Sequence, residues 1–341
     1  MRIDTHNHTL SPRVLSLIQS NPMYDVHIAG REFKGGADYT EFTLTDEWLE
    51  PSAKLRELDD KGLDVAVMCV PKPVCYWNLD PDAGEHAARE TNIGLAEFCS
   101  YDPKRLKWLA QLPLQAPERS SAVLRDAVRL GCSGVHAGTS IVGRRLDEPE
   151  FEPFWSAVEA ADMTVFVHPM FAAEFGVVRS ARPASSGAVA GKWPQWKVMT
   201  GLVGFPMEVT LMAERLMVSG VLANHPRARV HLALGGGFLP YQLGRLRMFK
   251  EKGDYPELRD SPAEPWSFIG QITIDTHVTD VRTLRFLIDR IGLENAALGT
   301  DAPFNVSNQD PIAELKLATD NDENIVRQVA EVNPARLFHV S

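Results

Sequence analysis

Eight short apolar runs alternate with longer stretches of helical periodicity along the 341 residues, and this alternation limits the folds that the chain can adopt. Runs of this length, bounded by Gly or Pro, are typical of buried parallel strands. They cover 2–7, 64–71, 106–112, 134–138, 164–168, 228–234, 271–275 and 296–299. Between them, apolar residues share one helical face, as do Phe151, Phe154, Trp155 and Val158, and also Leu284, Leu287, Ile288 and Ile291.

This order of elements predicts an α/β fold, a distorted (β/α)8 TIM barrel whose chemistry lies at the carboxyl ends of its strands. The alternation alone leaves a doubly wound open sheet as the alternative. Three segments, 22–45, 171–204 and 253–270, are longer than ordinary loops. We predict one domain over 1–341, with 22–45 as a small insertion after the first strand and 171–204 as an active-site lid. Trp193, in that lid, is a candidate substrate contact.

Composition excludes several classes of function. The chain has 35 Lys and Arg against 45 Asp and Glu, so its net charge of -10 predicts no general attraction to nucleic acid or anionic membranes. A small anionic substrate would need local positive charge. The first residues lack the pattern of a signal peptide, and no run approaches the about 18 apolar residues of a membrane helix. The four cysteines form no CxxC pair, which indicates reduced thiols and a cytoplasmic protein.

The first run contains the sharpest chemical signal, Asp4-Thr5-His6-Asn7-His8. In an extended strand alternate side chains point the same way, so the imidazoles of His6 and His8 converge. His168 ends another run, and Asp301 follows the last one. In a barrel these ends face one mouth, so three histidines and a carboxylate can surround a divalent ion, with zinc favoured and manganese as the alternative. Taken singly, each residue also fits a solvated tail, a hydrogen-bonded strand end or a helix cap.

The sequence resembles the decarboxylase branch of the amidohydrolase superfamily, which includes α-amino-β-carboxymuconate-ε-semialdehyde decarboxylase and γ-resorcylate decarboxylase. The resemblance spans essentially the whole chain. Its motifs, in order, are Asp-x-His-x-His at 4–8, His-Pro at 168–169, GFPME at 204–208, SGVL at 219–222, GGG at 235–237, GTD at 299–301 and NPARLF at 333–338.

The resemblance implies a zinc or similar ion held by His6, His8, His168 and Asp301 in a distorted barrel. It also implies a homodimer in which Arg245, often across the dimer interface, binds the substrate carboxylate. Lys54 matches a second cationic substrate contact of the family; a solvated helix lysine is the alternative. For Arg245 the alternative is a helix residue whose charged end reaches solvent.

The chain departs from the family's His-Gly-Gly-Gly motif at Leu234, which replaces a histidine that acts as acid or base. Leucine can do neither. His231 lies at an odd offset from Leu234, so strand alternation turns it away from that face. We consider His277 and His136, each near the carboxyl end of a predicted strand, as candidates to enter the site. The alternative for both is a half-buried histidine bonded to the backbone.

The resemblance to the decarboxylase branch favours metal-dependent, non-oxidative decarboxylation of an unsaturated or hydroxyaromatic acid, and the residues alone do not choose the reaction. Asp301 is our sequence-based candidate for the acid that protonates carbon before carbon dioxide leaves, since a carboxylate beside a metal can exchange a proton. The same ligands also suit a metal-dependent hydrolase of an amide, a lactone or a C–C bond. The lost histidine leaves a non-catalytic metal-binding protein as a third alternative.

Overall fold

The central sheet consists of eight parallel strands. The computed structural model describes residues 1–35, 40–170, 200–261 and 264–341. Every predicted run overlaps one strand of this sheet, so the predicted order is confirmed. The strands, each hydrogen-bonded to the next, are β1 (Ile3–His8), β5 (Val65–Cys69), β6 (Leu106–Gln111), β7 (Gly134–Gly138), β8 (Thr164–His168), β9 (Arg229–Leu232), β10 (Ile272–Asp275) and β11 (Ala296–Ala297).

Backbone hydrogen bonds between β1 and the segment after β11 close this sheet into a barrel. The Thr5 amide donates to Leu298 O at 2.8 Å, and the His8 amide donates to Ala302 O at 2.7 Å. In the other direction, the Asp301 amide donates to His6 O at 2.8 Å. The ring of strands excludes the doubly wound open sheet and confirms the predicted (β/α)8 barrel.

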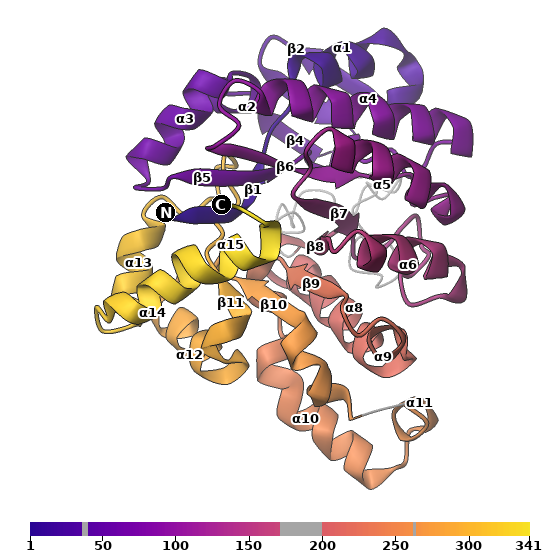
Figure 1. Cartoon of the computed structure of the whole chain (residues 1–341), viewed down its shortest axis with the longest axis vertical. Helices are drawn as coiled ribbons and strands as arrows, with labels where there is room; N and C mark the ends of the chain where they lie inside the picture. Colours follow the sequence, from indigo (N-terminus) through magenta and orange to yellow (C-terminus); the bar gives the residue numbers. More distant parts are fainter. Residues whose placement is uncertain (36–39, 171–199, 262–263) are drawn as a thin grey trace, which may run out of the picture.

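The helices surround the barrel (Figure 1). The predicted apolar faces are correct: Phe154, Trp155 and Val158 of α6 are buried, as are the four apolar residues of the predicted face of α12. The helices are α1 (Pro12–Ser20), α2 (Asp46–Leu49), α3 (Pro51–Asp60), α4 (Pro81–Cys99), α5 (Ser120–Arg129), α6 (Glu152–Ala160), α8 (Phe205–Ser219), α9 (Val221–Asn224), α10 (Leu239–Lys252), α11 (Pro256–Arg259), α12 (Val281–Ile291), α13 (Pro311–Ala318), α14 (Glu323–Arg327) and α15 (Asn333–Phe338).

A small antiparallel sheet follows α1 within the predicted insertion. It consists of β2 (Val26–Ala29), β3 (Glu32–Gly35) and β4 (Thr40–Thr43). A chain of aromatic contacts links it to the barrel: Phe42 lies 4.6 Å from Trp48, and Trp48 lies 4.9 Å from Phe304, measured between ring centroids. Phe304 in turn lies 5.1 Å from the ring of His8. This sheet therefore packs against one side of the barrel mouth.

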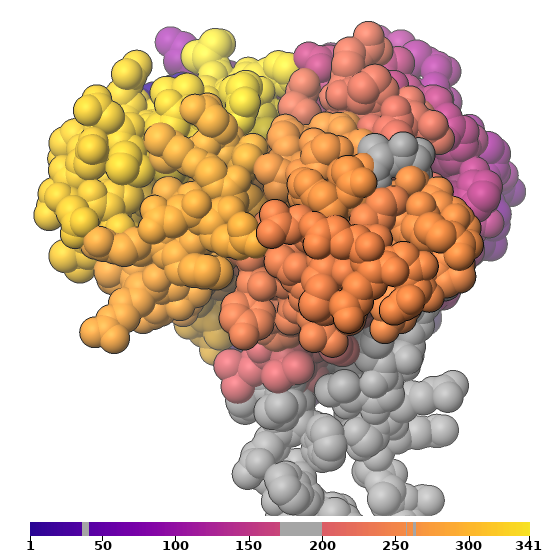
Figure 2. Space-filling model, turned by 90° about the horizontal axis from the view of Figure 1, so that it is seen from below, coloured from indigo at the N-terminus to yellow at the C-terminus, as the bar shows by residue number. Residues whose placement is uncertain are grey.

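Parts of the other long segments lie outside the described residues. These include 171–199, with Trp193, so the predicted lid is not described here. Thr200–Gly204 forms a π-helical turn that leads into α8. Helix α10 extends away from the barrel (Figure 1), and the view from below shows α10 and the orange segments after it forming much of the near face (Figure 2). In the part of the chain that the structure describes, no helix has both the length and the apolar character needed to span a bilayer.

Helix α15 closes the end of the barrel opposite its mouth. Phe338 has no exposed surface and packs in one cluster with Ile3, Val65 and Phe166, all from the barrel interior. Thr164 Oγ1 donates to Leu337 O at 2.6 Å, which joins the helix to the start of β8. The C-terminal segment is thus part of the barrel core.

We predict that Phe338→Ala lowers the free energy of unfolding by about 3–5 kcal/mol, because it leaves a cavity at the base of the barrel. Chemical denaturation measures this loss. The control is Phe286→Ala, which removes a ring that is 42% exposed on α12 and is expected to change stability by less than about 0.5 kcal/mol. If the two substitutions lowered the free energy of unfolding equally, α15 would not be the helix that closes the base of the barrel.

Candidate metal centre

Three imidazoles and one carboxylate meet at the mouth of the barrel. One ligand atom from each of His6, His8, His168 and Asp301 lies within 4.8 Å of all the others, and all four residues are buried. The ring centroids of the three histidines are 5.2–5.4 Å apart. Neutral imidazole nitrogen and carboxylate oxygen are the ligands that zinc and similar divalent ions prefer. The structure therefore brings together the four residues proposed from the sequence.

The shape of β1 turns both of its histidines toward this point. The pairing of β1 with β5 shifts register between Asp4 and Asn7, as in a β-bulge. Asp4 fixes the bulge: its carboxylate accepts from the amide and hydroxyl of Thr300 at 3.0 and 2.6 Å, and from Asn7 Nδ2 at 2.8 Å. These bonds place β1 next to Asp301.

Each histidine of the cluster is oriented through its Nδ1 atom. His6 Nδ1 lies 2.6 Å from Asp275 Oδ2, His168 Nδ1 lies 2.9 Å from Pro169 O, and His8 Nδ1 lies 3.4 Å from Cys69 Sγ. A histidine that donates from Nδ1 keeps a free electron pair on Nε2, the atom that can bind a metal. The outer partners therefore prepare all three rings as ligands.

Asp275 is the most heavily engaged of these partners. Besides His6, its two oxygens accept from the backbone amides of Leu234, Gly235 and His277 at 2.7–3.1 Å. Although burial raises the pKa of this carboxyl, its bonds to His6 lower it below the usual value. Gly299 permits the contact, because a Cβ there would lie 2.8 Å from Asp275 and 2.9 Å from His6.

The electrostatics of the cluster favour a positive charge at Nε2 of His6. Burial alone would lower the pKa of His6, but Asp301 and Asp275 together raise it to about 10. Nε2 is buried without a hydrogen-bond partner among the described residues, and Asp301 Oδ1 lies 3.2 Å away. Burial keeps the pKa of His168 well below its usual value, so that ring is neutral. A buried carboxylate beside a site that favours positive charge, together with a neutral imidazole, is a donor set that fits a divalent cation.

Asp301 combines two contacts at one oxygen. Its Oδ1 lies 3.2 Å from His6 Nε2 and 3.0 Å from His8 Nε2. Burial raises its pKa, but the neighbouring imidazoles hold the pKa well below the usual range. An unprotonated carboxylate suits the ligand role of Asp301, and the proton-donating role inferred from the sequence stays a prediction.

The two candidate histidines lie beside the cluster in different positions. His277 Nε2 is 3.7 Å from Asp301 Oδ2, and the His277 ring is 6.0 Å from that of His6. His136, on β7, is 6.1 Å from the ring of His168 and is 1% exposed. Burial lowers the pKa of His136 to about 3. His231 lies inside the barrel, between Thr5 Oγ1 at 2.8 Å and Thr273 Oγ1 at 2.9 Å, and burial lowers its pKa to about 4.

The two cationic candidates do not join the cluster within this single chain. Lys54 is fully buried, and its Nζ donates to Asn7 Oδ1 at 2.9 Å and Glu57 Oε2 at 2.7 Å. A solvated helix lysine is therefore wrong for Lys54, which instead connects α3 to β1. Arg245 is exposed on α10, with its guanidinium 4.6 Å from the ring centroid of Phe249.

Sequence reasoning missed Asp275 and Cys69 as partners of the ligands. Asp275 ends a predicted run, and Cys69 ends strand β5 within another, at the same edge as His168; that position was the available signal. In the motif after Leu234, Gly235, at φ +62°, presents its backbone amide to Asp275 in a left-handed conformation that glycine adopts readily.

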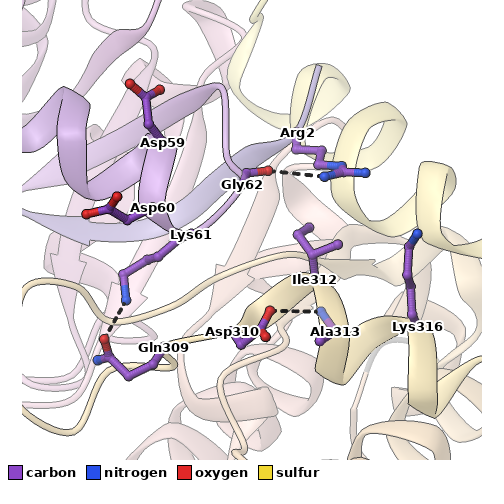
Figure 3. Close-up of a pocket in the computed structure, with 10 residues that line it drawn as sticks. All are labelled: Arg2, Asp59, Asp60, Lys61, Gly62, Gln309, Asp310, Ile312, Ala313 and Lys316. Carbon is purple, nitrogen blue, oxygen red and sulfur yellow. Dashed lines mark hydrogen bonds between the residues drawn. The ribbon is translucent and has the colours of Figure 1, made fainter.

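A separate hollow of about 440 Å³ lies on the outer surface between the end of α3 and α13, beside Arg2 (Figure 3). Three of its charged groups have hydrogen-bond partners in the protein. Arg2 donates to Gly62 O, Lys61 donates to Gln309 Oε1 and Asn308 O, and Asp310 accepts from the Ala313 amide. None of the cluster residues lines this hollow, so we assign no chemistry to it.

Comparison with known proteins identifies the family. Residues 3–340 match the sequence profile of the amidohydrolase family. The chain belongs to that family. It is 30% identical over 269 residues to 2-amino-3-carboxymuconate-6-semialdehyde decarboxylase of Dictyostelium discoideum, covering 78% of this chain and 68% of that protein. It is 27% identical over 329 residues to gamma-resorcylate decarboxylase of Rhizobium radiobacter, covering 88% and 93%.

A solved structure shows the same fold. The 5-carboxyvanillate decarboxylase of Novosphingobium aromaticivorans, in complex with manganese and 4-hydroxy-3-methoxy-5-nitrobenzoic acid, superposes with a TM-score of 0.75. The alignment covers 99% of this chain and 96% of that one, at 19% identity. The resemblance inferred from the motifs is thus confirmed.

We predict that Asp275→Asn weakens zinc binding by about 10–100-fold, because the amide no longer orients His6 through an ionised acceptor. Competition with a chelator of known affinity measures the change. Asp289→Asn, an exposed acid on α12, is the matched control and should bind zinc like the parent protein. Unchanged affinity in Asp275→Asn would show that this carboxylate does not support the cluster.

Proposed function

We propose that this chain is a metal-dependent, non-oxidative decarboxylase of a small unsaturated or hydroxyaromatic acid. The observation that carries the proposal is the convergence of His6, His8, His168 and Asp301 at the mouth of the barrel. The relatives indicate which reaction such a site performs, because both of those described above are decarboxylases. An α/β barrel alone would not choose between reactions.

The donor set supports a resident divalent ion, and we propose zinc as the first choice and manganese as the second. Three imidazoles and one carboxylate are typical zinc ligands. Manganese in the complex of the Novosphingobium decarboxylase supports the alternative. When bound, such an ion polarises and orients a hydroxyl or carboxylate oxygen of the substrate. His6, His8, His168 and Asp301 would hold it.

The residues around the ion have to bind an anion and exclude water. Phe304, whose ring lies 5.1 Å from that of His8, is an apolar wall on one side of the cluster. Water exclusion strengthens the electrostatic contacts of an anionic substrate with the site. Trp193 remains our proposed substrate contact from the segment outside the described residues.

We further propose that the active form is a homodimer in which Arg245 meets the substrate carboxylate of the partner copy. Helix α10 projects from the barrel, and Arg245 is exposed on it (Figure 1). Exposed aromatic and apolar residues lie nearby, namely Phe238, Tyr241 and Met248. An exposed apolar surface with an arginine is typical of a protein interface.

The four cysteines are free and buried, and we propose a cytoplasmic location on that basis.

The proposed function predicts that the metal-loaded protein releases carbon dioxide from at least one acid in a panel of hydroxybenzoates and muconate-type acids. Release should stop after chelation and return when zinc or manganese is added. The assay is run in water enriched in oxygen-18. Carbon dioxide release together with unlabelled organic product supports decarboxylation, whereas labelled product without gas release would establish hydrolysis and contradict the proposal.

A further inference from the structure

Only part of the cluster is accessible from the barrel mouth. The side chains of His6 and His8 have no exposed surface, whereas that of Asp301 is 12% exposed and that of His277 is 8% exposed. His168 is also 8% exposed. A substrate that reaches the ion therefore meets the side of the cluster formed by His168, Asp301 and His277. Two of these residues are candidate ligands, which leaves His277 free for another role.

The position of His277 is fixed by the same carboxylate that orients a ligand. The His277 amide donates to Asp275 Oδ1 at 3.1 Å, and Asp275 Oδ2 is 2.6 Å from His6 Nδ1. The Asp275 carboxylate, at the end of β10, thus fixes both the His277 backbone and the ring of His6. A site built on such fixed elements keeps a catalytic side chain in a constant position relative to the metal ligands.

The side chain of His277 retains unused hydrogen-bonding capacity. Its Nε2 is 3.7 Å from Asp301 Oδ2, too far for a direct hydrogen bond, and its buried Nδ1 has no partner among the described residues. Asp301 uses its other oxygen, Oδ1, toward His6 and His8. The Oδ2 atom therefore lies on the His277 side of Asp301, while Oδ1 stays within the ligand cluster.

Other proton-carrying groups near the cluster are less suitable. His136 is 1% exposed, and its Nδ1 lies 3.9 Å from Cys75 Sγ in the barrel interior. Cys69 is 1% exposed and contacts His8, while Lys54 is fully buried against Asn7 and Glu57. His277 combines access from the mouth, a fixed backbone and a free ring nitrogen.

We propose that His277 is the catalytic residue that delivers the proton in the decarboxylation, an assignment that rests on the proposed function. The protonated ring gives its proton from Nε2 to the substrate carbon that carries the carboxylate. The bond between that carbon and the carboxylate then breaks, its electron pair returns to the unsaturated system, and carbon dioxide leaves. The neutral ring regains a proton from water, so the sum is a carboxylate and a proton converted to carbon dioxide and a C–H bond.

The test compares His277→Gln with His225→Gln in the metal-loaded full-length protein. His225 is the matched control: it is buried, and its ring contacts Glu152 and Glu159 rather than the cluster. We expect His277→Gln to lower kcat by about 100-fold or more, as loss of a positioned acid does, with an unchanged metal content by elemental analysis. His225→Gln should keep kcat close to that of the parent.

A second readout separates proton transfer from a structural role. By reversal of the two steps, in which carbon dioxide adds before the proton leaves, the parent protein with added bicarbonate should exchange deuterium from heavy water into the product at the carbon that lost the carboxylate, measured by NMR. His277→Gln should lose this exchange although it still binds product. Exchange and turnover like the parent, or loss of the metal from His277→Gln, would overturn the assignment. Carbon dioxide release is first measured for the parent protein. If the parent releases none, the proposed function and the His277 assignment are both wrong. If the parent and His277→Gln release it at equal rates, only the His277 assignment is wrong.

Discussion

The hydrogen bonds between β1 and the segment after β11 are the constraint on which the site depends. Residues nearly 300 positions apart, such as Asp4 and Thr300, are joined there by bonds of 2.6 and 3.0 Å within the buried wall of the barrel. These bonds close the ring of strands and at the same time place Asp301 beside His6 and His8. Fold stability and ligand geometry are therefore consequences of the same contacts.

Burying several carboxylates at this junction costs free energy. Hydrogen bonds and nearby imidazoles offset this cost. Asp4, Asp275 and Asp301 are all buried, and each accepts several hydrogen bonds or faces imidazole nitrogens. Unpaired, each would cost several kcal/mol, on the order expected for a buried ion. The apolar layers lie on either side, with the aromatic contacts of Trp48 and Phe304 at the mouth and Phe338 at the base. Dry surroundings of this kind increase the strength of electrostatic contacts with a substrate.

The sequence predicted those features that depend on local pattern and on a general rule of barrel geometry. Eight apolar runs indicated the strands, and the rule that carboxyl ends share one face was enough to select His6, His8, His168 and Asp301. The rule could not give the partners of each side chain. Lys54 has the sequence context of an exposed helix residue, and only tertiary packing against Asn7 and Glu57 buries it. Asp275 was overlooked for a similar reason, because a strand-end carboxylate also fits a helix cap. In the dimer that we propose, the position of Arg245 relative to a substrate would depend on a second copy, which no single-chain pattern encodes.

The most direct test of this account is anomalous X-ray diffraction from crystals of the protein grown with zinc or manganese, with data collected at the absorption edge of the metal. One strong peak per chain is expected, within about 2.0–2.2 Å of Nε2 of His6, His8 and His168 and of an oxygen of Asp301. A peak at another place, or a peak at the barrel mouth that leaves out His168 or Asp301, would contradict the shared ion on which the proposed chemistry depends.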